Sequence, residues 1–165
     1  MDLKINKQNF ELFLEVTKKL NKVNIVPVLF GSLGLNRVIG EFSKANDIDF
    51  LVPDDLISKN WQKFIEIMKE LDFQLKDEHE HEFERNSEIV AFGKESDLSG
   101  LSQINPSDLI ISEVDGAKFK ELSARQYLLC YQKMLRDEYR QEKRGKADQD
   151  KIRLIEQFLN NQKKK

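Results

Sequence analysis

The sequence contains a single cysteine, Cys130, among 165 residues. One cysteine excludes a disulfide framework within the chain, and this composition favours a reducing, cytoplasmic setting. No apolar run approaches the ~20 residues that a membrane span needs. The amino terminus also lacks the apolar segment of a signal peptide. We therefore expect an unprocessed protein with no membrane partner.

An excess of charge of either sign is also absent. The chain has 27 Lys and Arg against 29 Asp and Glu, a formal net charge of -2. This balance does not indicate nucleic-acid binding or an acidic tail, and we interpret the basic end, Lys163–Lys165, as a solvated terminus. With 39% hydrophobic residues, the chain can bury a core as one domain over 1–165. We expect an α/β part to about residue 122 and a helical part over about 123–160.

The first forty residues predict a helix, a strand, a tight turn and a second helix. Apolar residues recur at helical spacing over 7–22. The next apolar run predicts a strand that begins near Val28, because the proline before it cannot donate to a ladder. Gly31 and Ser32 end this strand, and 33–39 predicts a short helix closed by a glycine.

The next predicted strand has two acidic side chains on one face. Hydrophobicity alternates with period two over 47–52, which places Asp47 and Asp49 on the same side of the strand. Apolar residues at helical spacing then predict an amphipathic helix over 58–71. We interpret Trp61 in this helix as a core residue.

The rest of the chain predicts a meander of short strands, a polar connection, a hairpin and two helices. Asp115 and Gly116 favour a type I′ turn in the hairpin. Ser123 and Gln126 form a capping-box pattern at the start of the first helix, and Gly145 is expected to stop it. The expected ranges are strands 73–76, 81–85 and 89–92, a connection over 99–107, hairpin strands 109–114 and 117–122, and helices 123–144 and 148–159.

Two pieces of this pattern suit phosphate and metal chemistry. A Gly-Ser turn that opens a helix, here Gly31 and Ser32, exposes backbone N–H groups and a hydroxyl to an anion, and the helix dipole adds attraction. Carboxylates at i and i+2 of a strand, here Asp47 and Asp49, can share one or two Mg²⁺ ions, which prefer hard oxygen ligands. Each piece alone is common, so the hypothesis depends on their order.

In this order the pieces resemble the signature of the DNA-polymerase-beta-like nucleotidyltransferase superfamily, especially its small bacterial minimal and aminoglycoside nucleotidyltransferase-like members. The signature is a hydrophobic strand ending in Gly-Gly or Gly-Ser, a spacer, and an acidic-hydrophobic-acidic-hydrophobic strand, matched here at 28–32 and 47–50. The resemblance implies an α+β nucleotidyltransferase fold, with a mixed sheet flanked by helices and helices at the carboxyl end. It also implies a nucleoside triphosphate held by Gly31 and Ser32, and a two-metal Mg²⁺ site on Asp47 and Asp49.

The chain departs from the family pattern in two respects. The spacer, 33–46, is slightly long, although Arg37 and Lys44 within it are candidates for phosphate contact. Active members of the family also supply a third carboxylate from a later strand, as base or metal ligand. The candidates here are Glu82, Glu84 and Glu88, of which Glu88 is favoured.

Two further motifs have alternative interpretations. His79 and His81 alternate with glutamates and suggest a zinc site, but no cysteine or further histidine completes a tetrahedral set, which favours a charged, solvent-facing hairpin. A basic-aromatic stretch in the helical part either grips a nucleotide or an RNA backbone, or is a solvated face with salt bridges. It comprises Tyr131, Arg136, Tyr139, Arg140, Lys143, Arg144 and Lys146. Tyr139-Arg140, Lys143-Arg144 and Asp148 with Lys151 resemble the helical tail with basic residues that follows the catalytic part in small family members.

The leading hypothesis is an enzyme that uses Mg²⁺ to transfer a nucleotidyl group from a nucleoside triphosphate to a hydroxyl of an unknown acceptor. The acceptor is a small molecule, a protein or an RNA end. The alternative is a catalytically inactive protein of the same fold that acts in binding or regulation, for example as a toxin-antitoxin component, since no third carboxylate is obvious. A purely structural oligomer would require the Asp47 and Asp49 pair to be buried in ion pairs.

Overall fold

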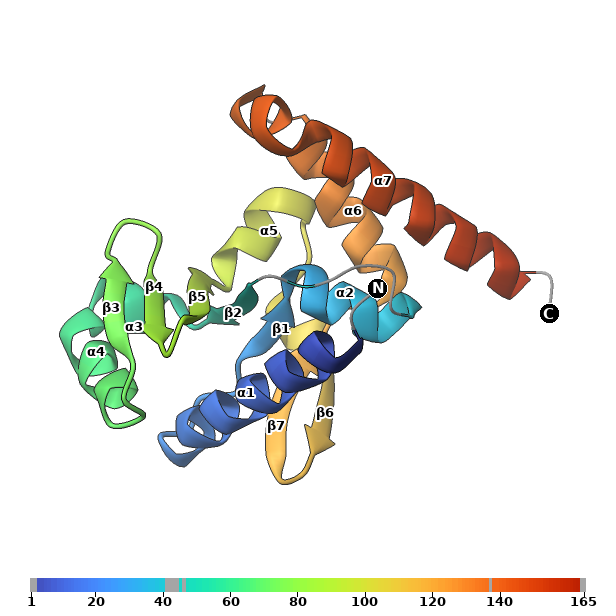
Figure 1. The fold of residues 1–165 in the computed structure, drawn as a ribbon. Helices are drawn as coiled ribbons and strands as arrows, with labels where there is room; N and C mark the ends of the chain where they lie inside the picture. Colours follow the sequence, from blue (N-terminus) through green and yellow to red (C-terminus); the bar gives the residue numbers. More distant parts are fainter. Residues whose placement is uncertain (1–2, 41–44, 46, 137, 164–165) are drawn as a thin grey trace.

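The computed structural model describes residues 3–40, 45, 47–136 and 138–163. The described residues form an α+β fold in which helices surround one mixed sheet, as the sequence predicted (Figure 1). The elements are α1 (Leu3–Lys22), β1 (Val28–Phe30), α2 (Gly31–Ile39), β2 (Ile48–Val52), α3 (Asp54–Ser58), α4 (Trp61–Lys69), β3 (Gln74–Asp77), β4 (Glu82–Arg85), β5 (Glu88–Lys94), α5 (Ser96–Ser102), the 3-10 turn η1 (Pro106–Asp108), β6 (Ile110–Val114), β7 (Ala117–Glu121), α6 (Ala124–Leu135) and α7 (Glu138–Lys163).

The two strands that carry the predicted motifs lie side by side within the sheet. Its strands run in the order β3-β4-β5-β2-β1-β7-β6. β1 pairs with β2 antiparallel and with β7 parallel, and β2 pairs with β5 parallel. The strands β3, β4 and β5 form the predicted antiparallel meander. β1 and β2 are therefore held by a neighbouring strand on each side.

Alternation along β2 sends three apolar side chains into one core and leaves Asp49 on the other face, together with Leu51. Ile48, Phe50 and Val52 are at most 1% exposed. They pack against α1 and α4, and the rings of Phe13 and Phe50 stack with centroids 4.7 Å apart. Each such burial contributes about 1.5–3 kcal/mol. On the other face a second apolar cluster joins α5, α6 and α7 to the sheet.

Two local predictions are confirmed by backbone geometry. Asp115 and Gly116 have φ of 50° and 84°, and a type I′ turn requires positive φ at both central residues. At the start of α6, the Ser123 hydroxyl accepts from the Gln126 amide at 3.2 Å, and the Gln126 side chain accepts from the Ser123 amide at 2.7 Å. These two bonds are the predicted capping box.

The predicted stop at Gly145 was wrong. The first of the two final helices ends at Leu135, and α7 continues through Gly145 to Lys163. A glycine inside a helix costs only about 1 kcal/mol relative to alanine. Packing of α7 on α6 outweighs this cost, since Ile155 is completely buried in the second apolar cluster.

Two further boundaries differ from the prediction. The helix predicted over 58–71 is α4, which runs over Trp61–Lys69. A separate short helix that was not predicted, α3, begins directly after Pro53, and its Ser58 hydroxyl donates back to the Asp54 carbonyl at 3.0 Å. The connection predicted over 99–107 contains α5 and η1. The apolar side chain of Leu98 is completely buried and packs α5 against the core. The polar composition of the stretch that follows does not predict this helix.

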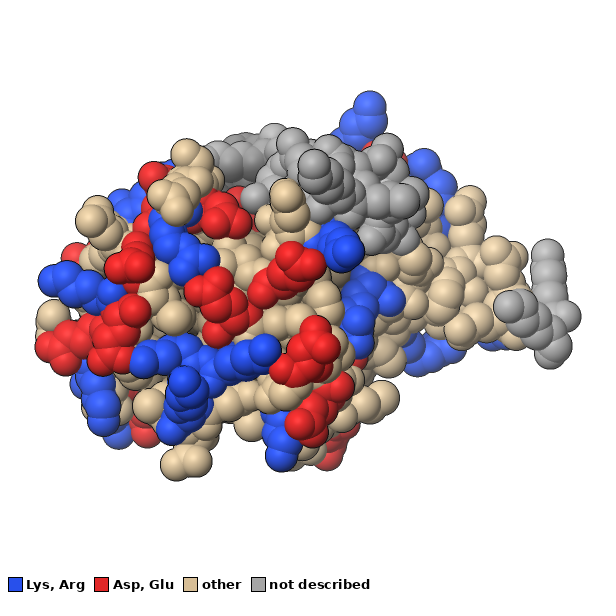
Figure 2. All heavy atoms as spheres, turned by 60° about the horizontal axis from the view of Figure 1, so that its bottom comes forward, with Lys and Arg blue, Asp and Glu red and all other residues tan. Residues whose placement is uncertain are grey.

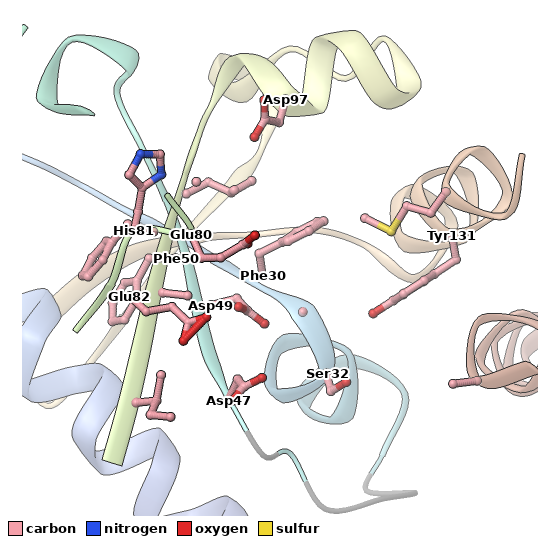
Figure 3. A pocket seen from close by; sticks show the side chains of 18 of the residues that line it. Phe30, Ser32, Asp47, Asp49, Phe50, Glu80, His81, Glu82, Asp97 and Tyr131 are labelled. Atoms are coloured by element: carbon pink, nitrogen blue, oxygen red, sulfur yellow. The ribbon is translucent and has the colours of Figure 1, made fainter. Parts of the chain in front are cut away.

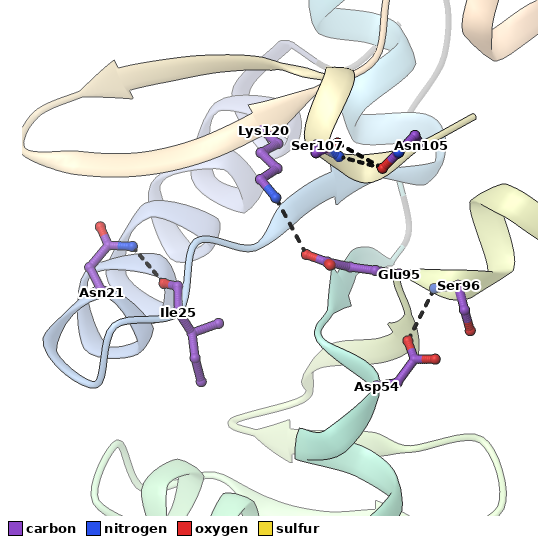
Figure 4. Close-up of polar contacts among 8 residues, drawn as sticks. All are labelled: Asn21, Ile25, Asp54, Glu95, Ser96, Asn105, Ser107 and Lys120. Carbon is purple, nitrogen blue, oxygen red and sulfur yellow. Dashed lines mark hydrogen bonds and ion pairs between the residues drawn. The ribbon is translucent and has the colours of Figure 1, made fainter.

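Polar contacts close the end of β2 that lies away from Asp49. The Lys120 ammonium lies 3.8 Å from the Glu95 carboxylate, and the Asp54 carboxylate accepts from the Ser96 amide at 3.1 Å (Figure 4). These contacts join β7 to Glu95 and α3 to the first residue of α5. Asp49, nearer the other end of the strand, lines a cleft.

The visible surface matches the balanced composition. Acidic and basic side chains are interspersed over the face in Figure 2 and form no patch of a single sign. Among the described residues, no helix combines the length and the apolar character needed to cross a membrane.

Candidate active site

The residues predicted from β1, α2 and β2 meet in one cleft. Its volume is about 950 Å³, and Gly31, Ser32, Asp47 and Asp49 all line it. The face of β5 and the β3–β4 turn form one wall, and α6 and α7 form the other (Figure 3). The two motifs meet because β1 and β2 pair antiparallel, which sets Phe30 beside Asp49.

The Gly31-Ser32 turn opens α2, and both residues line the cleft. Gly31 has φ of 73°, a left-handed conformation that favours glycine. Phe30, the N-cap residue, offers no side-chain hydrogen bond to the helix. The first turn of a helix has N–H groups without intrahelical partners. An uncapped first turn beside a serine hydroxyl is a suitable place for a phosphate group.

The two aspartates differ in burial and share one face. Asp47 is exposed and Asp49 is half-buried. The Asp49 carboxylate lies against Gly31 so closely that a Cβ on Gly31 would collide with Oδ2. The carboxylate therefore sits at the start of α2, next to the uncapped amides. A bound phosphate and an ion on these aspartates would be direct neighbours.

Glu82 extends this acidic row across the sheet. Asp49 pairs with Ala91 on β5, and Ala91 pairs with Glu82 on β4. Strand neighbours are spaced by about 4.8 Å, so the backbones of Asp49 and Glu82 are about 10 Å apart. The carboxylates of both residues point into the same part of the cleft (Figure 3). Burial, and then the charge of Asp47, raise the pKa of Glu82.

Glu88, the third carboxylate favoured from the sequence, does not line the cleft. Side chains along β5 alternate between the two faces of the sheet. Ile89 and Ala91 face the cleft, and Val90 is buried in the core on the opposite face. Glu88 therefore belongs to the face opposite the aspartates. Glu84 lies on the cleft face but forms an ion pair with Lys76 at 3.3 Å and is not part of the lining.

Arg37, one of the two basic spacer candidates, does not line the cleft. Arg37 Nε donates to Glu121 at 2.7 Å, and its guanidinium lies 4.9 Å from the Phe10 ring centroid. This side chain ties α2 to β7 and to α1, and it is not among the lining residues. Lys44 lies outside the described residues.

The histidines contribute to the wall of the cleft. His79 and His81 both line it, and the His81 ring lies edge-on to Trp61 with centroids 5.0 Å apart. Trp61 packs against Phe64 and Phe83, which confirms its prediction as a core residue. Within the described part of the chain, no three or more His, Cys, Asp or Glu side chains form a group able to hold a metal ion. A zinc site at the histidines thus gains no support.

Among the side chains that the structure describes, Lys151 is the basic residue of the predicted tail that lines the helical wall. Lys151 is 8% exposed, and its ammonium lies 5.1 Å from the Tyr131 ring centroid. Ala147, Lys151 and Leu154 line the cleft at i, i+4 and i+7 of α7, a helical spacing visible in the sequence. The side chains of 138–144, which include most of the basic-aromatic stretch, lie outside the described part. Sequence reasoning missed two acidic lining residues, Asp97 and Asp150.

Comparison with known sequences finds a bacterial relative. The uncharacterized protein YnaI of Bacillus subtilis (strain 168) is 34% identical over 150 residues, which cover 90% of this chain and 96% of YnaI. No model of a known protein family matches the sequence.

Comparison with solved structures identifies the fold. The antibiotic-resistance factor ANT(2'')-Ia aligns with a TM-score of 0.62 at 14% identity over 94% of this chain and 85% of that protein. A nucleotidyltransferase-like antigenic protein from Paracoccidioides brasiliensis aligns with a TM-score of 0.63 at 16% identity over 90% and 75% of the two chains. A crystal structure of ANT(2")-Ia in complex with adenylyl-2"-tobramycin aligns with a TM-score of 0.59 at 13% identity, over 95% and 92%. The fold is that of the nucleotidyltransferases, as the sequence predicted.

Proposed function

The chain belongs to the same family as YnaI, and we propose that it transfers a nucleotidyl group from a nucleoside triphosphate to an acceptor hydroxyl. The bond between the α- and β-phosphates breaks, and pyrophosphate leaves. The observation that supports this proposal is the contact between the Asp49 carboxylate and Gly31, at the uncapped start of α2. This contact brings a phosphate-binding turn and a metal-binding carboxylate together in one cleft. Nucleotidyl transfer needs both, because phosphate charge must be neutralised while the acceptor attacks.

The residues present fit Mg²⁺. The ion prefers carboxylate oxygens and is usually bound by one or two carboxylates together with substrate phosphates, not by a complete protein cage. Asp47 and Asp49 supply such a pair on one face of the cleft. When bound there, Mg²⁺ would neutralise charge on the phosphates.

The chain's own groups have separate roles in this proposal. Gly31 and Ser32 hold the polyphosphate by backbone amides and hydroxyl. Glu82 takes the proton from the acceptor hydroxyl, because its carboxylate points into the same part of the cleft as that of Asp49 (Figure 3). The position of Glu82 in the lining favours it over Glu88 for this role.

One observation favours a second candidate function, nucleotide binding without transfer. Ala91 occupies the position on β5 that directly neighbours Asp49. A carboxylate there would be the nearest possible third acid, and Glu82 lies one strand further away. If Glu82 does not act as base, the protein would bind Mg²⁺ and nucleotide as a regulatory module.

The first experiment measures nucleotide binding by calorimetry with each nucleoside triphosphate, with and without Mg²⁺. We expect Mg²⁺-dependent binding by the natural protein and at least tenfold weaker binding by Asp49→Asn. Glu113→Gln is the matched control, since Glu113 is an exposed acid on β6, away from the cleft. Absence of binding for every triphosphate would overturn both candidate functions.

The second experiment separates transfer from binding. Nucleoside triphosphates labelled at the α-phosphate are incubated with the protein and with small-molecule, protein or RNA fractions of a cell extract. Label should move into one fraction, and Asp49→Asn and Glu82→Gln should both prevent this transfer. Binding without transfer into any fraction or onto the protein itself would support the regulatory candidate instead.

A further inference from the structure

Tyr127 of α6 contacts both sides of the Gly31-Ser32 turn, although it lies far from the turn in sequence. Its hydroxyl donates to the Leu29 carbonyl at 3.2 Å, and its ring stacks on Phe30 with centroids 6.1 Å apart. On the other side of the turn, a Cβ on Gly34 would collide with the same hydroxyl. Tyr127 is 1% exposed, so these contacts are fully enclosed.

The Leu29 carbonyl accepts the Tyr127 hydrogen bond at the point where the pairing of β1 with β7 ends. The Pro27 carbonyl accepts from the Lys120 amide on β7 at 2.8 Å. Backbone groups two residues apart in a strand point the same way, so the Leu29 carbonyl also faces the β7 side. The pairing of β7 with β1 ends at Glu121. Tyr127 adds a hydrogen bond from α6 to this buried carbonyl.

The hydrogen bond is independent of pH over the working range of a protein. Burial raises the pKa of the Tyr127 hydroxyl well above its ordinary value, and the neighbouring Tyr131, Cys130, Glu121 and Asp49 add to this effect. The hydroxyl therefore remains a neutral donor.

We propose that Tyr127 is a positioning residue that links α6 to the triphosphate-binding turn and holds Gly31 and Ser32 in their binding geometry. This inference rests on the proposed function, in which that turn binds the triphosphate. β1 is only three residues long, so restraint of Leu29 and Phe30 restrains the whole approach to Gly31. Contact with Gly34 restrains the first turn of α2 from the opposite side. The helical end of the chain thereby controls the geometry of a motif contributed by its first part.

The test uses Tyr127→Phe, which keeps the ring and removes the hydroxyl. We expect the amide resonances of Gly31 and Ser32 to shift in nuclear magnetic resonance spectra, while those of β4 and β5 stay in place. We also expect Mg²⁺-dependent nucleotide binding to weaken about three- to tenfold, the effect of one lost hydrogen bond. Cys130→Ala is the control, because Cys130 is completely buried in the same helix. It should lower stability without either of these changes.

A double-mutant cycle tests the contact with Gly34. Gly34→Ala should weaken nucleotide binding, since its methyl group would meet the Tyr127 hydroxyl. Adding Tyr127→Phe should restore part of this loss. The restoration is incomplete because the new methyl group would still lie 3.2 Å from the Leu29 side chain and carbonyl. Effects that simply add would show that the hydroxyl does not restrain α2.

The outcomes distinguish this inference from the proposed function. If the natural protein binds no nucleotide, the proposed function fails, and the resonances of Gly31 and Ser32 still decide whether Tyr127 holds the turn. If nucleotide binds and Tyr127→Phe changes neither those resonances nor the affinity beyond Cys130→Ala, Tyr127 only fills the core and the inference is overturned.

Discussion

The Asp49 carboxylate occupies the space beside Gly31 that a side chain at position 31 would need. This contact couples the backbone of one motif to the acid of the other. Position 31 requires glycine for two reasons: its φ is 73°, and the Asp49 carboxylate approaches it closely. The two motifs therefore behave as one site that a single methyl group can disrupt.

Gly31→Ala should abolish Mg²⁺-dependent nucleotide binding and lower stability. The left-handed backbone costs about 1–3 kcal/mol for alanine, and displacement of Asp49 adds the loss of the metal site. Calorimetry and chemical denaturation measure the two effects. Gly116→Ala is the matched control, because Gly116 has φ of 84° with open space where the Cβ would stand. It should lower stability and leave binding intact; equal loss of binding in both variants would contradict the role of the Gly31 contact.

Glu82→Gln should raise stability at neutral pH while it removes transfer. The folded-state pKa of Glu82 lies above the ordinary value of 4.5, so the native state holds this proton more tightly than the unfolded chain does. The stabilising contribution of the protonated form is complete below pH 4.5 and is lost as the pH rises through the folded-state pKa. The difference in melting temperature between variant and natural protein should therefore grow with pH and then level off.

Glu88→Gln is the comparison for this prediction. Glu88 lies on the opposite face of the sheet, so the substitution should leave transfer unchanged. Loss of transfer in Glu88→Gln but not in Glu82→Gln would assign the third acid to Glu88.

Ala91→Asp should create a tighter Mg²⁺ site. The new carboxylate would stand between Asp49 and Glu82 in the pairing register. Without Mg²⁺, repulsion among the acids should lower the melting temperature. Added Mg²⁺ should raise the melting temperature of this variant more than that of the natural protein, because the ion binds only the native arrangement of the acids. Ala91→Asn, which adds similar bulk without charge, should show no extra response; the same Mg²⁺ response in both variants would exclude a metal site in this row.

Arg37→Gln should reduce stability and leave nucleotide affinity within about twofold. Arg37 pairs with Glu121 and covers the Phe10 ring, contacts worth about 1 kcal/mol together. Chemical denaturation measures the stability and calorimetry the affinity. Lys59→Gln, which breaks an exposed pair with Asp55 at 3.8 Å, should change neither. A tenfold loss of nucleotide affinity in Arg37→Gln would instead support a contact between Arg37 and the phosphates.

Local patterns in the sequence were sufficient for most elements and for the two motifs. Period-two alternation placed Asp47 and Asp49 on one face, and the Asp115-Gly116 turn and the Ser123 capping box were read from residues within four positions of each other. Such features depend on backbone preferences and on hydrogen bonds between near neighbours. The boundary at Gly145 was missed because the packing of α7 on α6 outweighs a local preference of about 1 kcal/mol.

The nucleotidyltransferase signature, the alternation that places its acids on one face and the need for glycine at a tight turn all follow from local residue patterns. Which glutamate faces those acids depends instead on the packing of the strands, since Glu82 and Glu88 are separated by the strand order and by the face on which each side chain lies. The tertiary structure also decided that Arg37 pairs with Glu121 and that Tyr127 reaches Leu29. These contacts join residues that are far apart in the chain. Which residues meet is determined by how whole helices and strands pack on one another.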